Sequence, residues 1–327
     1  MSHRKLNALE RERIGQLLFN GQSLRDIARI MGRNVSTISR EIERNASSRY
    51  SYSAIAGQER AIHMSGRRNN KKKIDTNPAL WDYIYKKLGL RWSPEQISVS
   101  LQKKHPDDKS MQVSPETIYT YLYMLPRGEL KKEVLKYLRH KKSSRGRQKR
   151  INEKRSRIPD IISIEERPKE VEDRTIPGHW EGDLLVGKDH KSALGSIVER
   201  TTRSLILVPL KAKDALTVRK AFSREMKKLP KQMALSLTYD RGTEMTQHKL
   251  FTKETEIQVY FAHPSSPWER GTNENTNMLI RDFFPKGTDF NTITRREIKR
   301  VQKLLNERPR KTLNWETPKE AFSVLLH

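Results

Sequence analysis

Apolar residues recur at helical spacing along the N-terminal part of the chain and predict three short helices. The first begins at Asn7, where Glu10 completes a capping-box pattern, and it ends at Gly21. The second begins at Ser23 and ends at Gly32, and the third follows after a short turn. Two helices joined by a glycine-containing turn form the helix-turn-helix pattern that is typical of DNA-binding proteins.

The predicted third helix carries the residues that would read DNA. Val35, Ile38 and Ile42 fall on one side of this helix and are expected to face the core. The polar positions between them then point outward, as in a recognition helix. The same pattern also fits a small helical bundle with a solvated face. The candidate DNA-contacting residues are Ser36, Thr37, Ser39 and Arg40.

A second signature of this kind follows further along the chain. Ser93 is the predicted helix cap, Pro94 the first helical position and Gln96 the capping-box partner. A further helix is predicted over residues 114–123, so the pair forms a helix-turn-helix with a longer loop. The tyrosines of that helix could contact phosphate or pack inside the protein, and the pattern does not choose between these two roles.

In the C-terminal half, from residue 175 onward, the apolar positions form short runs that are typical of strands. Three runs separated by turn residues predict an antiparallel meander over 179–187, 192–199 and 204–210. A helix over 214–229, a strand over 235–239, another helix, a strand over 257–262 and a helix over 271–284 follow. This order predicts an α/β domain with a five-stranded mixed sheet.

The charge of the chain indicates a polyanionic partner. The 327 residues contain 66 Lys or Arg against 39 Asp or Glu, which gives a formal net charge of +27. Such a balance is typical of proteins that bind nucleic acid. The absence of cysteine excludes disulfide scaffolds, thiolate zinc sites and cysteine nucleophiles. The apolar runs are too short to cross a bilayer, so we expect an intracellular protein without a membrane partner.

The densest basic stretch lies between the helical and the α/β regions. Residues 139–157 hold ten Lys or Arg against one Glu. A run this polar cannot bury enough surface to fold alone, so we expect a linker that binds along phosphates. A tether that only improves solubility is the alternative. The candidate DNA contacts here are Arg145, Arg147, Lys149 and Arg150.

Three carboxylates from separate predicted elements suggest a metal site. Asp183 lies within the first strand, Asp240 ends the fourth strand, and Glu274 lies on the helix after the last strand. A carboxylate inside an apolar strand is costly unless it is paired or binds a metal. Oxygen ligands without His or Cys suit Mg²⁺ or Mn²⁺. Two such ions can activate a water or a 3′-hydroxyl and stabilise the leaving oxygen in phosphodiester cleavage.

Each carboxylate also has a purely structural interpretation. Asp183 shares a strand face with Glu181, and either residue could form a salt bridge at the sheet edge. Asp240 could form a turn, because Asp-Arg-Gly is a common turn sequence. Glu274 competes with Glu269, and its asparagine neighbours could cap a helix. Spacing alone does not show that the three side chains converge.

Three segments carry a more specific signal: HWEGD at 179–183, LTYDRG at 237–242 and SPWERGTNENTN at 266–277. They resemble the three acidic motifs of the IS-thirty family of bacterial insertion-sequence transposases. Further similar stretches lie at 35–41, 92–97, 284–289 and 308–313, so the resemblance covers almost the whole chain. The third acidic motif is long and therefore highly specific.

The resemblance implies a ribonuclease-H-like core with an Asp-Asp-Glu triad, here Asp183, Asp240 and Glu274. It also implies two Mg²⁺ or Mn²⁺ ions, a bacterial cytoplasmic protein associated with the nucleoid, and a homo-oligomer in the synaptic complex, because two DNA ends must be held together. The chain departs from the family at His263, where Asp is usual, and at Met278, where a small Gly is common. His263 is interpreted as a neutral replacement, and Met278 as a change in the packing of the Glu274 helix.

The sequence thus predicts a multidomain protein in which N-terminal all-α helix-turn-helix units precede an α/β ribonuclease-H-like catalytic core. The predicted parts are a helix-turn-helix domain at 1–64, a second such helical domain at 65–138, a basic linker at 139–174 and a catalytic domain with C-terminal helices at 175–327.

The predicted function is that of a DNA transposase. It binds the terminal inverted repeats of an insertion sequence and catalyses metal-dependent cleavage and strand transfer, with transposon ends and target DNA as its double-stranded partners. Two other classes compete with this prediction. A DNA-binding regulator that has lost catalysis is disfavoured by the intact Asp183, Asp240 and Glu274. A simple nuclease without strand transfer is disfavoured by the two helix-turn-helix patterns.

Overall fold

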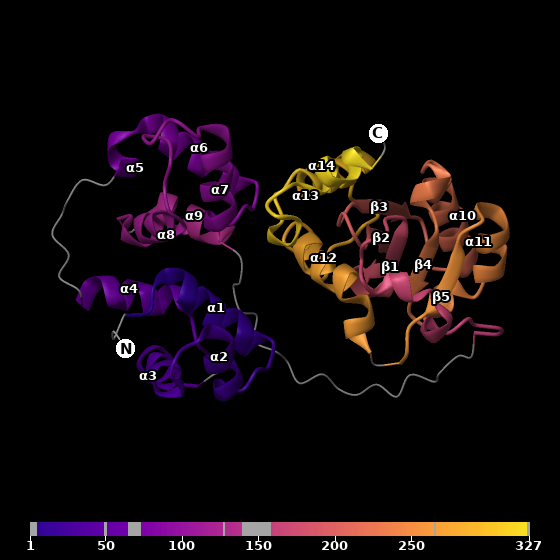
Figure 1. Ribbon diagram of the computed structural model, residues 1–327, viewed down its shortest axis with the longest axis horizontal. Coiled ribbons are helices and arrows are strands. Elements are labelled where there is room, and N and C mark those ends of the chain that lie inside the picture. The colour runs from indigo at the N-terminus through magenta and orange to yellow at the C-terminus, as the bar shows by residue number, and fades with distance from the viewer. Residues whose placement is uncertain are drawn as a thin grey trace. The chain divides into compact units, whose positions relative to one another are not determined.

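The computed structural model describes residues 5–48, 51–64, 73–126, 128–138, 158–264 and 266–325. The chain forms two compact units, one within Met1–Ile151 and the other within Asn152–His327 (Figure 1). The first unit is all-helical and the second is built on a sheet. The linker residues that were predicted to contact DNA lie outside the described ranges; they are Arg145, Arg147, Lys149 and Arg150.

The helical unit begins with the three predicted helices. Asn7 and Glu10 form the predicted capping box, and Gly32 ends the second helix in the left-handed conformation with φ of 60°. The side chains at the centre of the three-helix core are fully buried: Ile14, Ile27 and Ile38. The helices are α1 (Ala8–Phe19), α2 (Leu24–Met31) and α3 (Val35–Asn45).

A buried ion pair ties α1 to α3 and to the next helix, α4 (Ala54–Met64). Arg11 Nε donates to Glu41 Oε1 at 2.8 Å, and its Nη1 donates to Gln58 Oε1 on α4 at 2.7 Å. The Tyr52 hydroxyl also donates to Glu41, at 3.2 Å. Burial, reinforced by the charge of Glu41, raises the pKa of Tyr52, so its hydroxyl remains a donor. The pair therefore fixes the angle between the helices.

The second helical region follows the predicted pattern as well. Ser93 and Gln96 form a capping box at the start of α7. Tyr119 and Tyr123 on α8 are buried, and Tyr121 packs on Trp81 with ring centroids 5.1 Å apart, so these tyrosines pack. The helices are α5 (Lys73–Thr76), α6 (Pro78–Gly89), α7 (Pro94–Lys104), α8 (Pro115–Met124) and α9 (Glu129–Tyr137).

The two helical regions share one hydrophobic core. Helices α1 and α4 both pack against α8, and Ala8 belongs to the same apolar cluster as the side chains of α6 to α9. The backbone N–H of Ala8 donates to Glu116 Oε2 at 2.9 Å, and Lys131 pairs with Glu59 at 2.9 Å. The helix-turn-helix part and the second helical region thus belong to one compact unit.

The second unit contains the predicted five-stranded mixed sheet, in the order β3-β2-β1-β4-β5. The first three strands form the predicted antiparallel meander, and β1, β4 and β5 pair in parallel. Strand β1 therefore lies at the centre, where the antiparallel and parallel halves meet. The strands are β1 (His179–Val186), β2 (Ala193–Glu199), β3 (Leu205–Leu210), β4 (Ser236–Tyr239) and β5 (Gln258–Phe261).

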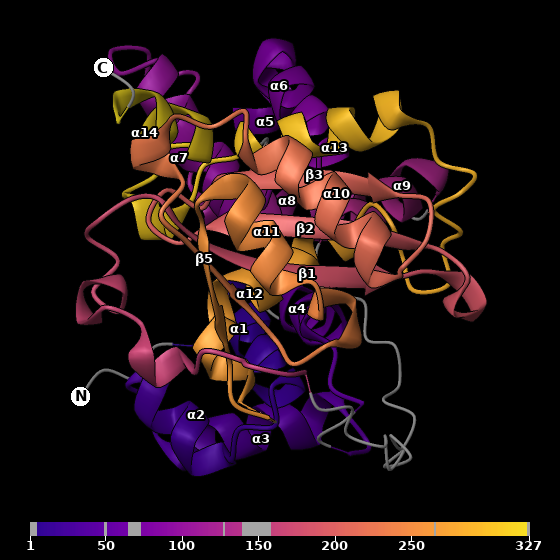
Figure 2. The same ribbon diagram turned by 90° about the vertical axis from the view of Figure 1, so that its right-hand side faces the viewer.

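Helices cover both faces of this sheet. One apolar cluster packs α10 (Ala215–Met226) and α11 (His248–Thr255) on one face, and another packs α12 (Gly271–Arg281) and α13 (Arg295–Asn306) on the opposite face. Figure 1 shows α12 and α13 on one side of the strands, and Figure 2 shows the sheet from the side of α10 and α11. The last helix, α14 (Pro318–Val324), packs against α13.

Candidate active site

Strand β1 directs two acids toward the face that α12 covers. Trp180 belongs to the cluster on the α10 side, and its Nε1 donates to the Met233 carbonyl at 2.8 Å. Glu181 and Asp183 alternate with it and contact α12. Gly182 between them has no room for a side chain, because an added Cβ would lie 2.7 Å from the ring of Tyr239. The strand can therefore lie close to β4.

Asp183, in the middle of β1, lies beside Asp240, which directly follows the carboxyl end of the parallel strand β4. In the parallel register of β1 and β4, Glu181 pairs with Thr238. Continuing this register by two positions places Asp183 beside Asp240. Asn277 donates to Asp183 Oδ2 at 2.7 Å. Burial raises the pKa of Asp183; the charge of Arg270 opposes this shift and that of Asp240 adds to it. Asp240 is more exposed, at 41% of its side chain.

Asp240 also forms the turn that its sequence context suggested as an alternative. Its Oδ1 accepts a hydrogen bond from the backbone N–H of Gly242 at 3.2 Å. The second oxygen, Oδ2, is directed to the site, where it accepts from Arg270. The turn therefore orients the carboxylate, and the two interpretations of Asp240 are compatible.

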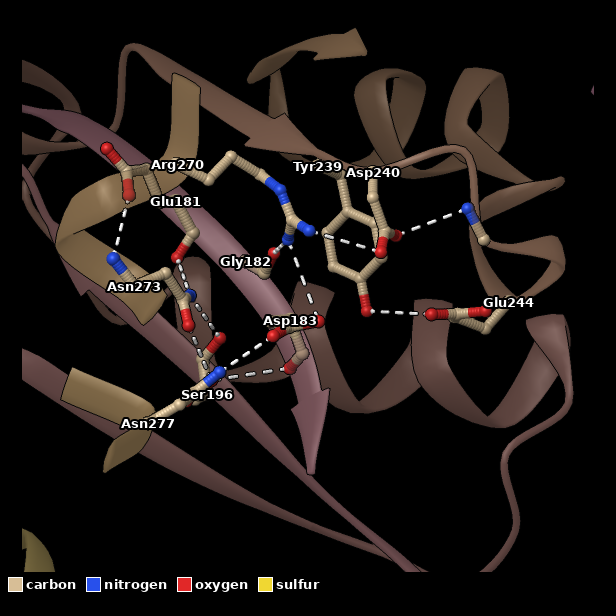
Figure 3. Close-up of polar contacts among 11 residues, drawn as sticks. Glu181, Gly182, Asp183, Ser196, Tyr239, Asp240, Glu244, Arg270, Asn273 and Asn277 are labelled. Atoms are coloured by element: carbon tan, nitrogen blue, oxygen red, sulfur yellow. Dashed lines mark hydrogen bonds and ion pairs between the residues drawn. The ribbon is translucent and has the colours of Figure 1, made fainter. Parts of the chain in front are cut away.

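The guanidinium of Arg270 joins the two carboxylates (Figure 3). Its Nη1 lies 3.6 Å from Asp183 Oδ1, and its Nη2 lies 3.2 Å from Asp240 Oδ2. Nη1 also donates to the Gly182 carbonyl at 2.9 Å. Burial alone would lower the pKa of Arg270. The negative charges of Asp240 and Asp183 outweigh this effect, so the pKa of Arg270 is raised. Two carboxylates and one cation thus form the centre of the site.

The asparagines of the third motif fix α12 on the sheet. Glu181 Oε2 accepts from the backbone N–H of Asn273, in the first turn of α12, at 2.8 Å, and Asn273 Nδ2 donates to the Glu181 carbonyl at 2.8 Å. Ser196 on β2 donates to Asn277 Oδ1 at 2.8 Å. A carboxylate at a helix N-terminus is also favoured by the helix dipole. These asparagines bind the sheet rather than cap their own helix.

Glu274 does not join the two aspartates in this structure. Glu274 lies on α12, one helical turn after the N-cap residue Arg270, and its side chain is exposed. In the described part of the chain it makes no hydrogen bond or ion pair, and these residues hold no cluster of three His, Cys, Asp or Glu poised to bind a metal. The structure thus brings together Asp183 and Asp240, and it leaves Glu274 at the edge of the site.

The competing acid, Glu269, is engaged by His263. Its Oε2 accepts from the backbone N–H of His263 at 2.7 Å, and its Oε1 lies 2.8 Å from His263 Nδ1. Burial alone would raise the pKa of Glu269. The hydrogen bonds from His263 outweigh this effect, so the pKa of Glu269 is lowered. Met278 is half exposed and takes no part in the core beneath α12.

Two participants in this site were not assigned from the sequence, Arg270 and Glu244. Arg270 has a local signal, because it precedes Glu274 by one helical turn inside the third motif. Glu244 accepts from the Tyr239 hydroxyl at 3.3 Å, and burial together with the charge of Asp240 raises its pKa. The contact between Glu181 and Asn273 on α12 was also not predicted, because the two residues are 92 positions apart in the sequence.

The candidate recognition residues lie on α3 as expected, with one difference. Ser36 and Arg40 are exposed, whereas Thr37 and Ser39 are half-buried, and Ser39 donates to Glu43 at 2.8 Å. Val35 was expected in the core but is 40% exposed. It is the first residue after the Asn34 cap, so it lies beyond the end of the three-helix core.

Comparison with known families identifies both units. The model described as "Helix-turn-helix domain" matches residues 2–45, and the model described as "Integrase core domain" matches residues 174–267. A helix-turn-helix domain followed by an integrase core defines an enzyme of the class that cuts and joins DNA. None of the described helices is long and apolar enough to span a membrane.

Full-length relatives identify the family. The chain is 39% identical over 324 residues to the transposase of insertion sequence element IS1086 from Cupriavidus metallidurans, covering 99% of this chain and 96% of the relative. It is 42% identical over 319 residues to transposase InsI of element IS30A from Escherichia coli K12, covering 96% and 82%. The chain belongs to the IS-thirty (IS30) family of transposases.

A solved structure also aligns with the sheet unit. The catalytic core domain of BIV integrase matches with a TM-score of 0.36 and 17% identity, covering 46% of this chain and 96% of the integrase core.

Proposed function

We propose that Asp183, Asp240 and Glu274 are the acids with which this transposase cuts the ends of its insertion sequence and joins them to target DNA. The observation that carries the proposal is that two of the acids share one cation. Arg270 lies 3.6 Å from Asp183 and 3.2 Å from Asp240. Two carboxylates held by one guanidinium also concentrate negative charge at one place, which favours a shared metal ion.

The donor set fits Mg²⁺ or Mn²⁺, because all three side chains offer carboxylate oxygens, the ligands that these ions prefer. Asp183 and Asp240 would hold one ion together, and Glu274 would complete a second site. When bound, the ions supply an activated water or 3′-hydroxyl and stabilise the leaving oxygen of the cut phosphodiester.

The remaining residues of the site position these acids. Asn277 donates to Asp183 Oδ2 and so fixes the direction of the other oxygen, Oδ1, which lies near Arg270. Glu181 and Asn273 fix α12 on β1, and the helix in turn carries Glu274. Since Glu274 has no contact to break in the described part of the chain, it can turn toward DNA at little cost.

The DNA-binding roles are part of the same proposal. Helix α3, with Ser36, Thr37, Ser39 and Arg40, reads the terminal inverted repeats, and Arg145, Arg147, Lys149 and Arg150 contact phosphates. The active form is a homo-oligomer, because both ends of the element must be held together for transfer. It acts on the nucleoid in the bacterial cytoplasm.

One assay separates this proposal from its two rivals. Labelled duplexes with the end sequences of the element that encodes this chain are incubated with the full-length protein, Mg²⁺ and a plasmid target. Cleavage at the ends followed by joining to the plasmid supports the transposase. Binding without cleavage would favour a regulator, and cleavage without joining would favour a nuclease.

We expect Arg40 and the basic linker to contribute to binding in different ways. Arg40→Ala removes a base contact and should cost about 1–3 kcal/mol on end DNA but little on random DNA. Neutralising Arg145, Arg147, Lys149 and Arg150 together should weaken binding to both DNAs alike and lower the salt slope by up to ~0.9 per lost contact. Binding titrations at several salt concentrations measure both effects.

The matched control is Arg29→Ala, which removes an arginine of the same unit whose side chain is 79% exposed and paired with Asp26. It should bind end DNA like the wild type. Equal losses on end and random DNA for Arg40→Ala would contradict the assignment of α3 as the recognition helix.

A further inference from the structure

Helix α13 carries a basic surface that the proposed active site does not use. Its buried stripe is Ile298, Val301 and Leu305, which pack against the sheet and α12. The opposite side of the helix is lined by exposed cations: Arg295, Arg296, Lys299, Arg300 and Lys303. Lys299 lies 3.9 Å from Glu225 on α10 and donates to Gln302.

Four of these cations, Arg295, Arg296, Arg300 and Lys303, form no side-chain hydrogen bond or ion pair with the described part of the chain. Arg296, Arg300 and Lys303 follow one another at helical spacing in one row and are here called the basic face of α13. Like charges at this helical spacing destabilise a helix. The acid of this helix, Glu297, is exposed and forms an ion pair with none of the three. The chain thus leaves the repulsion uncompensated, and an anionic partner would relieve it.

The spacing of the basic face matches a DNA backbone. At ~1.5 Å per residue, Arg296 and Lys303 are separated by ~10 Å along the helix. One DNA strand advances ~3.4 Å along the axis per phosphate, so about three phosphates span the same length. Three cations in one row can therefore each approach a phosphate of one strand.

The basic face lies on the same side of the sheet as the catalytic acids. Helix α13 packs on β3 and α12, and Asp183 contacts α12. Strand β3 is two strands from β1, which is ~10 Å at the usual strand separation. Helix α10 packs on the opposite face, and Lys299 of α13 reaches Glu225 of α10 at the edge strand β3. A duplex that lies over Asp183 and Asp240 and extends across β2 and β3 on this face would therefore reach α13 before α10.

We propose that the basic face of α13 binds the backbone of the duplex that lies in the active site, so that the catalytic unit holds DNA independently of the helix-turn-helix. This inference rests on the proposed function, since it places DNA at Asp183 and Asp240. Duplex DNA is the partner because the face offers only cations, without apolar side chains, and the chain carries a net charge of +27.

The absence of cysteine from the chain permits a specific test. Arg300→Cys introduces a single thiol into the full-length protein. The probe is the end duplex, with an alkyl thiol tethered near the cleavage position as a mixed disulfide. The protein thiolate attacks this disulfide, forms a protein–DNA disulfide and releases the small thiol. Lys220→Cys on α10, at an exposed and unpaired position of the described chain, is the matched control.

We expect Arg300→Cys to cross-link several times more than Lys220→Cys at each tether position near the cut. A second pair of variants tests the charge: glutamine at Arg296, Arg300 and Lys303, against glutamine at the exposed Lys213, Lys220 and Lys227. The first set should reduce the salt slope of binding by up to ~2.7, and the second should change it little.

Equal cross-linking by the two cysteine variants, or equal salt slopes for the two glutamine sets, would overturn the assignment of α13. If the wild type does not cleave end DNA at all, the proposed function fails instead. Melting curves should show every variant to be at least as stable as the wild type, because the substituted side chains are exposed and the glutamine set on α13 removes like-charge repulsion.

A second inference follows from the contacts of Arg270, independently of α13. We infer that a divalent ion and Arg270 compete for the same carboxylates, so that Arg270 must leave Asp183 and Asp240 when the metal binds. The guanidinium already contacts both acids and is only 17% exposed. A dication shared by the same two acids would repel it at close range. The inference rests on the proposed function.

The test measures metal binding rather than activity. Full-length protein without DNA is titrated with Mn²⁺, and the free ion is followed by electron paramagnetic resonance. Arg270→Gln should bind Mn²⁺ about tenfold more tightly than the wild type, a typical coupling between two linked sites. Arg270→Lys, which keeps the charge, should stay near the wild type. The control is Arg281→Gln. It also removes a positive charge from α12, but the guanidinium of Arg281 donates to the Val186 carbonyl and not to either aspartate.

Unchanged or weaker Mn²⁺ binding by Arg270→Gln would overturn the competition. The double variant Asp183→Asn with Asp240→Asn tests the metal site itself and should lose Mn²⁺ binding. If it binds as the wild type does, the proposed metal ligands are wrong, whatever Arg270 does.

Discussion

Asp183→Asn, Asp240→Asn and Glu274→Gln should each abolish cleavage of element ends while end DNA is still bound. Each change removes one charged ligand, and metal ions supply several kcal/mol of transition-state stabilisation, which corresponds to a loss of ~10³-fold or more in rate. Binding should persist because the recognition helix belongs to the other compact unit. Single-turnover cleavage with labelled ends measures the rate, and a gel-shift titration measures binding.

The control for the third acid is Glu269→Gln, because Glu269 is an acid of the same motif that is bound to His263. It should retain cleavage. If Glu274→Gln cleaves normally and Glu269→Gln does not, Glu269 is the third acid and the proposed triad must change. Loss of end binding together with cleavage would point to unfolding instead.

Glu181→Ala should destabilise the catalytic unit more than any exposed charge change. The side chains of Glu181 and Arg200 are 0% and 6% exposed, and their charged atoms lie 3.3 Å apart. Removing one partner of a buried pair costs about 3–5 kcal/mol, because the other charge is left without compensation. The variant also loses the carboxylate that accepts from the Asn273 backbone N–H. Urea unfolding monitored by tryptophan fluorescence measures the loss.

Lys249→Ala is the control, since its ion pair with Asp160 is exposed on both sides, at 65% and 68%. We expect a change of about 1 kcal/mol or less for this surface pair. A Glu181→Ala protein as stable as the Lys249→Ala protein would show that Arg200 does not depend on Glu181. Glu181→Gln, which keeps the size and one acceptor oxygen, should lie between the two.

Local signals predicted the elements of this fold well. The caps at Asn7 and Ser93 involve residues three positions apart, so the sequence contains all that forms them. The strand order of the meander also follows from short connections. Val35 was misplaced because helical spacing gives the side of a helix but not the point where the core ends.

The contacts that build the proposed active site are long-range, and spacing could not predict them. Asp183 and Asp240 were identified by their positions in strands and by resemblance, but their common partner Arg270 was not. Arg270 reaches the Gly182 carbonyl across 88 positions. Asn273, beside Glu274, was considered as a helix cap, although its partner is Glu181 on the sheet. Sheet register decides such contacts, and it follows from the whole fold.

The central position of β1 has a consequence for how the protein is made. Its partners β2 and β3 follow it directly in the chain, whereas β4 is added only after α10, and α12 comes later still. Roughly 130 residues separate the end of α9 from Arg270, which a ribosome adds in roughly 6–26 s. During that interval the helical unit can fold as a domain of its own, while Asp183 gains Asp240 only late and Arg270 last. The helical unit can therefore fold before the residues that are proposed to cut DNA come together.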